Sequence, residues 1–191
     1  MKKYKELIDY HIDYKNKSVL NMLNTKYIIV PDSGGAPRAR VNYAALGSAW
    51  FPQEFKMVEN ADSEILALDN FDPEQTAIVD KRYSGYLEGI QPGQHDTTDS
   101  INLTSYELDH LTYSAHSSSE RLTVFSEIFY DKGWQAYIDG KPVDHIRVNY
   151  VLRALRVPTG DHSIEFQFHP ENYYRGEKIS FASSLILLLY V

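Results

Sequence analysis

Alternation of apolar and polar residues is the main pattern in the last third of the chain. Every second residue is apolar in residues 134–138 and again in residues 162–169. Because successive side chains of a strand point to opposite faces, both runs predict strands with one buried and one solvent-exposed face. Residues 122–130 are apolar and aromatic, and residues 147–157 alternate again, which predicts one further strand in each range.

Turn residues separate these runs. Asp139 and Gly140 form the strongest short hairpin signal in the chain, because a type I′ turn needs positive φ at both central positions. Residues 158–161 read as the next turn, and residues 101–116 contain further strand formers. We therefore expect about six or seven antiparallel strands, which is enough for a two-sheet sandwich.

The first part of the chain has helical periodicity instead. Residues 4–14 place apolar side chains on one face of an amphipathic helix. Ser18 and Asp62 with Ser63 stand where N-caps of two short helices are expected. Residues 27–30 and 76–80 read as short strands, and residues 31–37 read as a loop.

These patterns predict an α+β chain that is mostly β, a small N-terminal α+β unit followed by an antiparallel β-sandwich, with an apolar C-terminal segment. The expected parts are an amphipathic helix at 1–17, the α+β unit at 18–83, a linker or long loop at 84–100, the sandwich at 101–175 and the start of a transmembrane helix at 176–191.

The C-terminal prediction depends on residues 179–191, which carry no charged side chain. Spanning a bilayer takes about 20 apolar residues, so this run is shorter than a full span. Besides the start of a membrane helix, a buried core element and an interfacial segment fit the same pattern.

Composition narrows the function classes. The net charge of −7 argues against nucleic acid, since phosphate binding draws on clustered Lys and Arg. Cysteine is absent, which excludes disulfides, thiolate metal sites and cysteine nucleophiles. The 15 tyrosines fit half-buried strands and also sugar-binding surfaces, and the strand interpretation is the simpler one.

Catalytic and metal-binding patterns are weak. The seven histidines form no H-x-H or H-E-x-x-H motif, and His95 with Asp96 and Asp99 reads more simply as a solvated loop than as a cation site. Glu127 has the parity of a partly buried strand residue, and a raised pKa there would suit a glycosidase-type carboxylate. The simpler interpretation is a structural pair with Arg147 or Arg153 across strands. We expect no catalytic residue, no metal and no cofactor in this chain.

Aromatic residues around the Asp139–Gly140 hairpin are the best binding candidates. Sugars stack on aromatic faces with polar groups at the rim. Trp134 shares parity with core positions, whereas Tyr137 lies on the opposite parity and is expected to be exposed. The candidate ligand-binding residues are Tyr130, Trp134, Tyr137, Asp139, Asn149, Tyr150 and Arg153.

Several stretches resemble one family. They read FSEIFYDKGWQAYIDGKPV, RVNYVLRALRVPTGDHSIEFQFHPENY, VLNMLNTKYIIV and NYAALGSAWFPQEFKMV. The chain resembles, over roughly residues 5 to 185, the C-terminal extracytoplasmic region of YfhO-like bacterial membrane proteins, which are related to GT-C glycosyltransferases that use polyprenyl-phosphate sugars. The membrane helices and the catalytic site expected in that family would lie upstream of these residues.

The resemblance implies a non-catalytic, extracytoplasmic accessory domain of a protein that serves cell-envelope glycan or lipid-linked sugar transfer. Its implied partners are the membrane, reached through the C-terminal segment and an upstream membrane region, and a glycan or lipid-linked sugar. The alternative is an independent carbohydrate-binding or protein-interaction module. The first hypothesis predicts a projecting apolar C-terminal helix, and the second an exposed aromatic platform.

Overall fold

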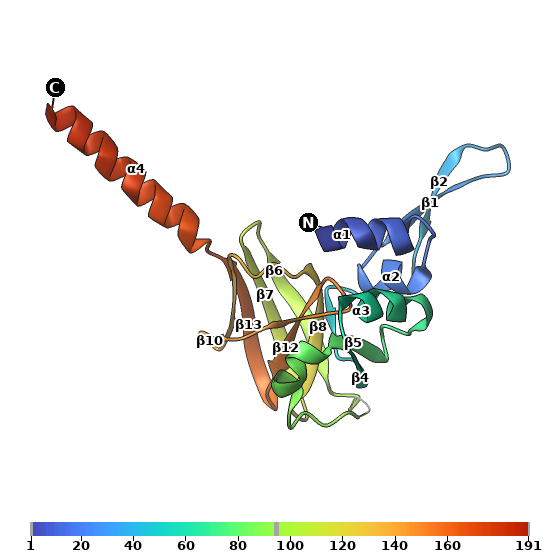
Figure 1. Cartoon of the computed structure of the whole chain (residues 1–191). Helices are drawn as coiled ribbons and strands as arrows, with labels where there is room; N and C mark the ends of the chain where they lie inside the picture. The colour runs from blue at the N-terminus through green and yellow to red at the C-terminus, as the bar shows by residue number, and fades with distance from the viewer. Residues whose placement is uncertain (1, 94–95, 191) are drawn as a thin grey trace.

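Two antiparallel sheets form the body of the molecule (Figure 1). The structure, a computed structural model, describes residues 2–93 and 96–190. One sheet has the strand order β10-β9-β13-β7-β6 and the other β11-β12-β8-β3. Their strands are β3 (Ala49–Trp50), β6 (Ser100–Tyr106), β7 (His110–Ser117), β8 (Arg121–Ile128), β9 (Trp134–Ile138), β10 (Lys141–Val143), β11 (Ile146–Val148), β12 (Leu152–Val157) and β13 (Gly160–Phe168).

The two sheets pack face to face through the alternating apolar residues. Tyr113, Phe125 and Phe166 meet edge to face at the centre, where the Phe125 centroid lies 4.9 Å from each of the other two. These residues come from β7, β8 and β13, so both sheets contribute to one core. Burial of such aromatic side chains is the largest favourable contribution available to a sandwich of this size. The prediction of a mostly β, antiparallel fold is confirmed.

The hairpin between β9 and β10 forms as the sequence predicts. Asp139 and Gly140 adopt φ of 50° and 73°, and Ile138 pairs with Lys141 across the turn. Positive φ at both central residues matches the right-handed twist of the two strands.

The prediction of one strand over residues 147–157 is wrong. The range is a second hairpin, in which β11 and β12 pair antiparallel and Asn149 and Tyr150 form the turn with φ of 48° and 71°. The Asn149 Oδ1 atom accepts a hydrogen bond from the Ile78 backbone N–H at 2.7 Å, and a Glu64 carboxylate oxygen accepts one from the Tyr150 N–H at 3.0 Å. These distant partners favour a turn that the local pattern did not predict.

The N-terminal part is a set of short elements at one side of the sheets. They are α1 (Lys2–Leu7), the π-helical turn η1 (Ile8–Ile12), α2 (Lys17–Met22), β1 (Tyr27–Pro31), β2 (Pro37–Val41), β4 (Glu54–Val58), α3 (Ala61–Ala67), the 3₁₀ turn η2 (Leu68–Asn70), β5 (Thr76–Asp80) and the 3₁₀ turn η3 (Lys81–Leu87). Helices and strands form where predicted, but two caps differ. Asn16 caps α2 in place of Ser18, and Asn60 caps α3 in place of Asp62 or Ser63. An Asn side chain caps as well as Ser or Asp does, which is why Asn16 and Asn60, both slightly earlier in the chain, can take these positions.

The N-terminal part and the sandwich share one hydrophobic core. Leu7 of α1, Ile78 of β5 and Leu152 of β12 belong to the same buried cluster. β3 pairs with β8, so a strand from the N-terminal part also completes the second sheet. The division of the chain at residues 84–100 stays a prediction, and the two sides of that division are joined by packing.

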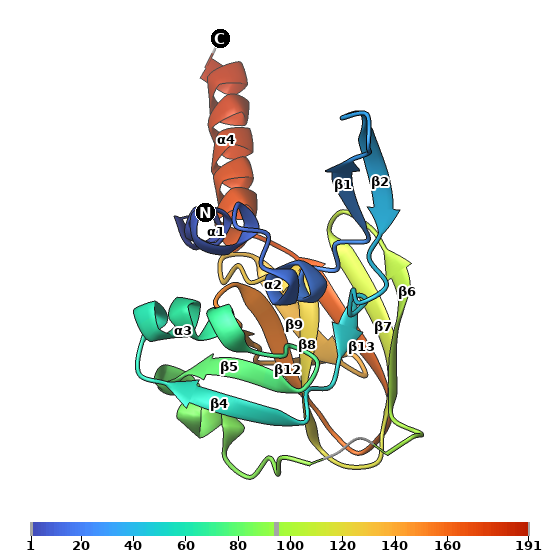
Figure 2. The same ribbon diagram turned by 90° about the vertical axis from the view of Figure 1, so that its right-hand side faces the viewer.

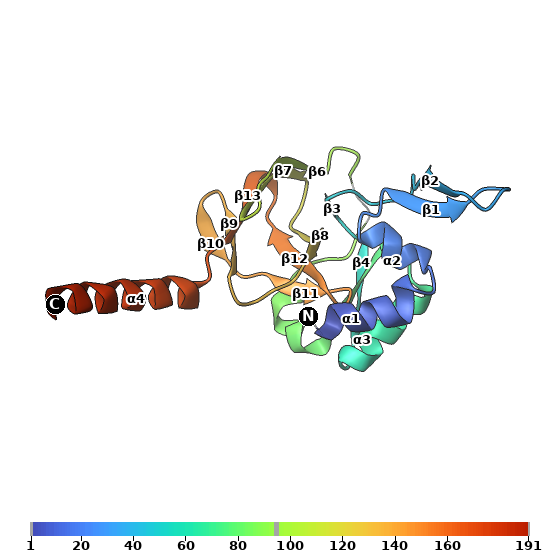
Figure 3. The same cartoon turned by 90° about the horizontal axis from the view of Figure 1, so that it is seen from above.

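Two elements project from the body. The hairpin β1–β2 and the helix α4 (Glu171–Tyr190) rise from the same end and diverge, as Figures 2 and 3 show. Described α4 side chains are exposed along its whole length. Within residues 2–93 and 96–190, the helices fall short of the length and apolar character needed to cross a membrane. The predicted start of a transmembrane helix at 176–191 is therefore not confirmed. The helix that contains this stretch begins earlier, at Glu171, and its first half is polar.

Candidate pocket between the edge strands

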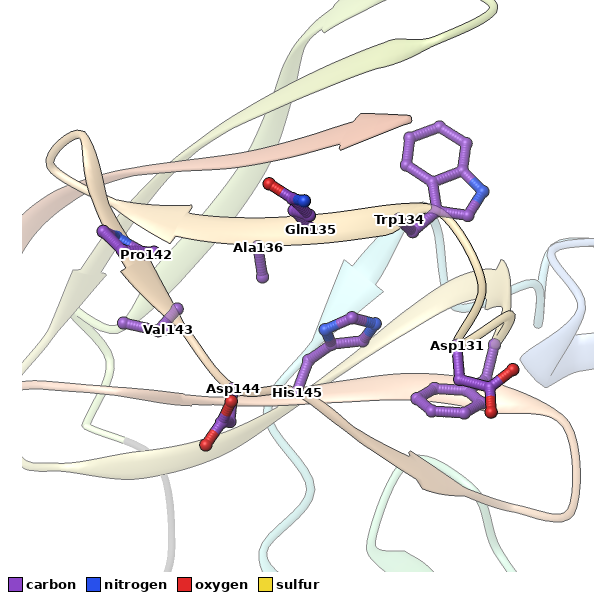
Figure 4. A pocket seen from close by; sticks show the side chains of 9 residues that line it. Asp131, Trp134, Gln135, Ala136, Pro142, Val143, Asp144 and His145 are labelled. Carbon is purple, nitrogen blue, oxygen red and sulfur yellow. The ribbon is translucent and has the colours of Figure 1, made fainter. Parts of the chain in front are cut away.

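A hollow of about 450 Å³ opens where the sandwich is incomplete (Figure 4). β10 is an edge strand of one sheet and β11 is an edge strand of the other. The chain crosses between them through Asp144 and His145 without forming a ladder there, so the two sheets stay apart at this edge. The lining residues are Phe129, Asp131, Trp134, Gln135, Ala136, Pro142, Val143, Asp144 and His145.

His145 lies between the two layers. Its ring centroid is 5.3 Å from that of Phe129 and 5.7 Å from that of Phe166. Burial lowers the His145 pKa to about 4, and the Arg153 charge acts in the same direction. The imidazole is therefore neutral at pH 7. Its Nε2 atom is buried and has no hydrogen-bond partner among the described residues.

Arg153 packs against Trp134, outside the lining of the pocket. Its guanidinium carbon lies 4.1 Å from the Trp134 ring centroid and 5.2 Å from that of Phe166, which are cation–π distances. The Nε atom donates a hydrogen bond to the Ile128 carbonyl at 3.1 Å. Burial lowers the Arg153 pKa to about 10, against the opposing effect of Glu127. The buried Nη1 atom has no partner in the described part of the chain.

Glu127 is a negative charge that acts on this cation. Burial raises the pKa of its carboxyl group, and the Arg153 charge opposes that rise. Of the two cross-strand partners suggested, Arg147 instead contacts Glu64, with 3.3 Å between its Nη2 atom and a carboxylate oxygen.

The mouth of the pocket is polar and acidic. Asp131, Gln135 and Asp144 are exposed there, and the aromatic rings of Phe129 and Trp134 belong to the walls. Carboxylates accept hydrogen bonds from hydroxyl groups, and aromatic faces pack against the C–H faces of sugar rings. Two exposed carboxylates also repel an anion. The arrangement suits the uncharged, hydroxyl-rich sugar part of a ligand.

The structure separates the seven candidate ligand-binding residues. Trp134 lines the pocket and Arg153 lies directly behind it. Tyr130 is exposed, with its ring centroid 6.4 Å from that of Phe168. Tyr137 points to the other face of β9, where its hydroxyl donates a hydrogen bond to Gln135 at 2.7 Å.

The other three candidates have structural partners elsewhere. Asp139 accepts hydrogen bonds from His162 at 2.7 Å and from the Ser163 N–H at 2.9 Å. Asn149 and Tyr150 are buried in the β11–β12 turn, and the Tyr150 hydroxyl donates to Glu6. Only Trp134 and Arg153 are thus brought together at the pocket, and binding by the set stays a prediction.

Sequence reasoning missed His145 and Asp144 as pocket residues. They lie in the crossing between two edge strands, and that position exists only after the sheets have formed. The one local signal was a polar pair directly before the apolar alternation of residues 146–148.

Two further histidines contact carboxylates across strands. His110 pairs with Glu165 at 2.8 Å and His116 with Asp161 at 2.7 Å. Asp99 accepts a hydrogen bond from the Ser118 N–H, and its carboxylate lies 3.0 Å from the Arg121 Nε atom. These contacts give Asp99 a structural role. His95 lies outside the described residues. Among those described, no three His, Asp or Glu side chains are arranged to hold a metal ion.

Comparison with known proteins identifies a family. The sequence profile described as "Bacterial membrane protein YfhO" matches residues 83–180, just over half of the chain. The chain is also similar to the "Uncharacterized protein YfhO" of Bacillus subtilis (strain 168), with 24% identity over 115 residues. That alignment covers 60% of this chain and 13% of the relative, so the chain corresponds to a small part of that protein's length. No solved structure matches the chain.

Proposed function

Because the chain belongs to the YfhO family of bacterial membrane proteins, we propose that it is a non-catalytic accessory domain on the extracytoplasmic side of the membrane. Its role is to hold a glycan or lipid-linked sugar for a transfer reaction of the cell envelope. The side of the membrane and the link to sugar transfer come from the resemblance to GT-C-related proteins.

The pocket between β10 and β11 is the observation that supports binding. Its volume of about 450 Å³ falls in the range of small-ligand sites. Aromatic walls and exposed carboxylates form a set that matches sugar hydroxyl groups and ring faces. The same chemistry serves an independent carbohydrate-binding module, and family membership favours the accessory domain over that alternative.

Contact with the membrane is assigned to α4. Its second half carries exposed Ile179, Phe181 and Leu185, together with the apolar residues that follow. An exposed apolar run of this kind is stabilised by transfer into lipid. The helix leaves the body directly after β13, next to the start of β9, so membrane contact would bring the Trp134 end of the pocket close to the lipid.

Binding of the full chain to an array of neutral and acidic glycans tests the proposal. Asp131→Asn and Asp144→Asn keep the size of each side chain and remove its charge. We expect the double variant to bind a neutral oligosaccharide about tenfold more weakly, which corresponds to one or two lost charge-assisted hydrogen bonds.

Tyr106→Ala is the matched control, since Tyr106 is an exposed aromatic residue on β6, at the opposite edge of the sheet from β10. It should leave the affinity unchanged. An equal loss of binding in Tyr106→Ala would show that the effect does not come from the pocket. If no glycan binds the parent chain, the domain has no sugar-holding role.

A further inference from the structure

The hairpin β1–β2 has one face that is wholly apolar. Its pairs Tyr27–Val41, Ile29–Ala39 and Pro31–Pro37 share one side, because paired residues lie on the same face and alternate pairs on opposite faces. We call these six residues the apolar hairpin face. Ile29 is 73% exposed and Tyr27 is 65% exposed.

The opposite side of the hairpin has a different character. There Ile28 pairs with Arg40 and Val30 with Arg38. The hairpin is therefore a two-sided ribbon, apolar on one side and carrying two arginines on the other. Amphipathic elements with this distribution are typical of the membrane–water interface.

The distribution of charge along the chain also favours contact with a membrane surface. Residues 1–43 contain eight Lys or Arg and four Asp or Glu, whereas the remaining residues contain eleven and twenty-two. The segment that carries the hairpin is thus positive within an acidic protein. A positive segment complements the negative surface of a bilayer that contains anionic lipid.

The hairpin lies at the same end of the body as α4. Both rise from the same end of the body (Figure 2). The β6–β7 turn lies beside the start of α4, because the Phe168 N–H donates a hydrogen bond to the Asp109 carbonyl at 2.7 Å. That turn presents Leu108, which is 97% exposed.

We propose that the apolar hairpin face rests on the surface of a bilayer that contains anionic phospholipid. This gives the domain a second lipid contact besides α4, and it rests on the membrane association in the proposed function. The hairpin lies at the interface rather than in the hydrocarbon, because both strand edges have backbone groups that need water or headgroups as partners. Tyr27 occupies the headgroup level, where tyrosine is enriched.

Single-cysteine labelling tests this contact, since the natural chain has no cysteine. Ile29→Cys places an environment-sensitive fluorophore on the apolar hairpin face, Arg40→Cys on the opposite face and Leu185→Cys on α4. Each labelled full chain is mixed with vesicles of phosphatidylcholine that contain about one third phosphatidylglycerol, an anionic lipid.

We expect the label at position 29 to become shielded from aqueous iodide when vesicles are added, and the label at position 40 to stay accessible. Shielding at 185 with full access at 29 would overturn the hairpin contact and leave the membrane association standing. Access at both 29 and 185 would overturn both. Shielding at 29 that needs no vesicles and rises with protein concentration would overturn the proposal in favour of a second copy of the chain.

An affinity measurement gives an independent result. Ile29→Asp should weaken vesicle binding about tenfold, because it places a charge on the apolar hairpin face. Leu66→Asp is the matched control, since Leu66 is a similarly exposed apolar residue on α3. An equal loss in both variants would contradict a specific role for the hairpin.

Discussion

His145 shows how one buried side chain couples the pocket to pH. Its pKa is about 4 in the folded chain and 6.5 as the ordinary value. Between these values the unfolded chain binds more protons, so the free energy of unfolding rises with pH over this window. Stability attributable to His145 is therefore lost as the pH falls from 6.5 toward 4.

We predict that His145→Phe removes this part of the pH dependence. Phenylalanine keeps the packing against Phe129 and Phe166 but has no proton to gain. Relative to the parent chain, the variant should lose about 2–3 kcal/mol less stability between pH 7.5 and pH 4, as measured by urea unfolding at both values.

His162 provides a control of opposite sign. The hydrogen bond to Asp139 raises the His162 pKa, so the stability that this pair contributes is present below the ordinary histidine pKa and is lost as the pH rises through the raised value. His162→Gln should therefore cost more at pH 6 than at pH 8.5. Parallel pH profiles for the two variants would contradict both assignments.

Formation of the β11–β12 hairpin depends on contacts with residues far away in the sequence. Its turn residue Asn149 adopts φ of 48° and accepts a hydrogen bond from the buried Ile78 N–H. Removing the acceptor leaves a buried donor unpaired.

We predict that Asn149→Ala lowers the free energy of unfolding by about 2–3 kcal/mol, the sum of an unpaired buried N–H and the cost of positive φ. Asn24→Ala isolates the second contribution, because Asn24 also has positive φ, at 53°. It should cost about 1 kcal/mol. Equal losses in denaturant unfolding would show that the Ile78 contact contributes nothing.

At the scale of the whole molecule, a buried charge cluster connects the N-terminal helix, α3 and the second sheet. Glu64 is fully buried on α3, and its carboxylate lies 3.3 Å from Arg147 and 3.7 Å from Lys3. The Lys3 ammonium group also lies 3.6 Å from the Tyr150 ring centroid. Segments that are far apart in the chain thus depend on one carboxylate.

We predict that Glu64→Gln destabilises the chain by about 3 kcal/mol, because Lys3 then lacks its buried counter-charge and Arg147 keeps only Asp80, at 3.9 Å. Glu59→Gln removes an exposed pair with Lys81 and should cost less than about 1 kcal/mol. Both variants should unfold in a single transition, since the N-terminal part and the sandwich share a core. Two separate transitions would show that they unfold independently.

The sequence by itself determined the elements that rest on local physics. Alternation predicted β9 and β13, because a strand exposed on one face must be apolar at every second residue. Asp139 and Gly140 predicted the β9–β10 turn, because their backbones accept positive φ. The motifs of the last third predicted the family that the comparisons identify.

Only the tertiary structure decided where residues from distant segments meet. The alternation of residues 147–157 fits a single strand, yet Ile78 and Glu64 stabilise a turn in its middle. The pocket exists because β10 and β11 are edges of different sheets, and a local pattern cannot predict the order of strands. Strand order follows from burial of the whole core, which depends on residues far apart in the chain.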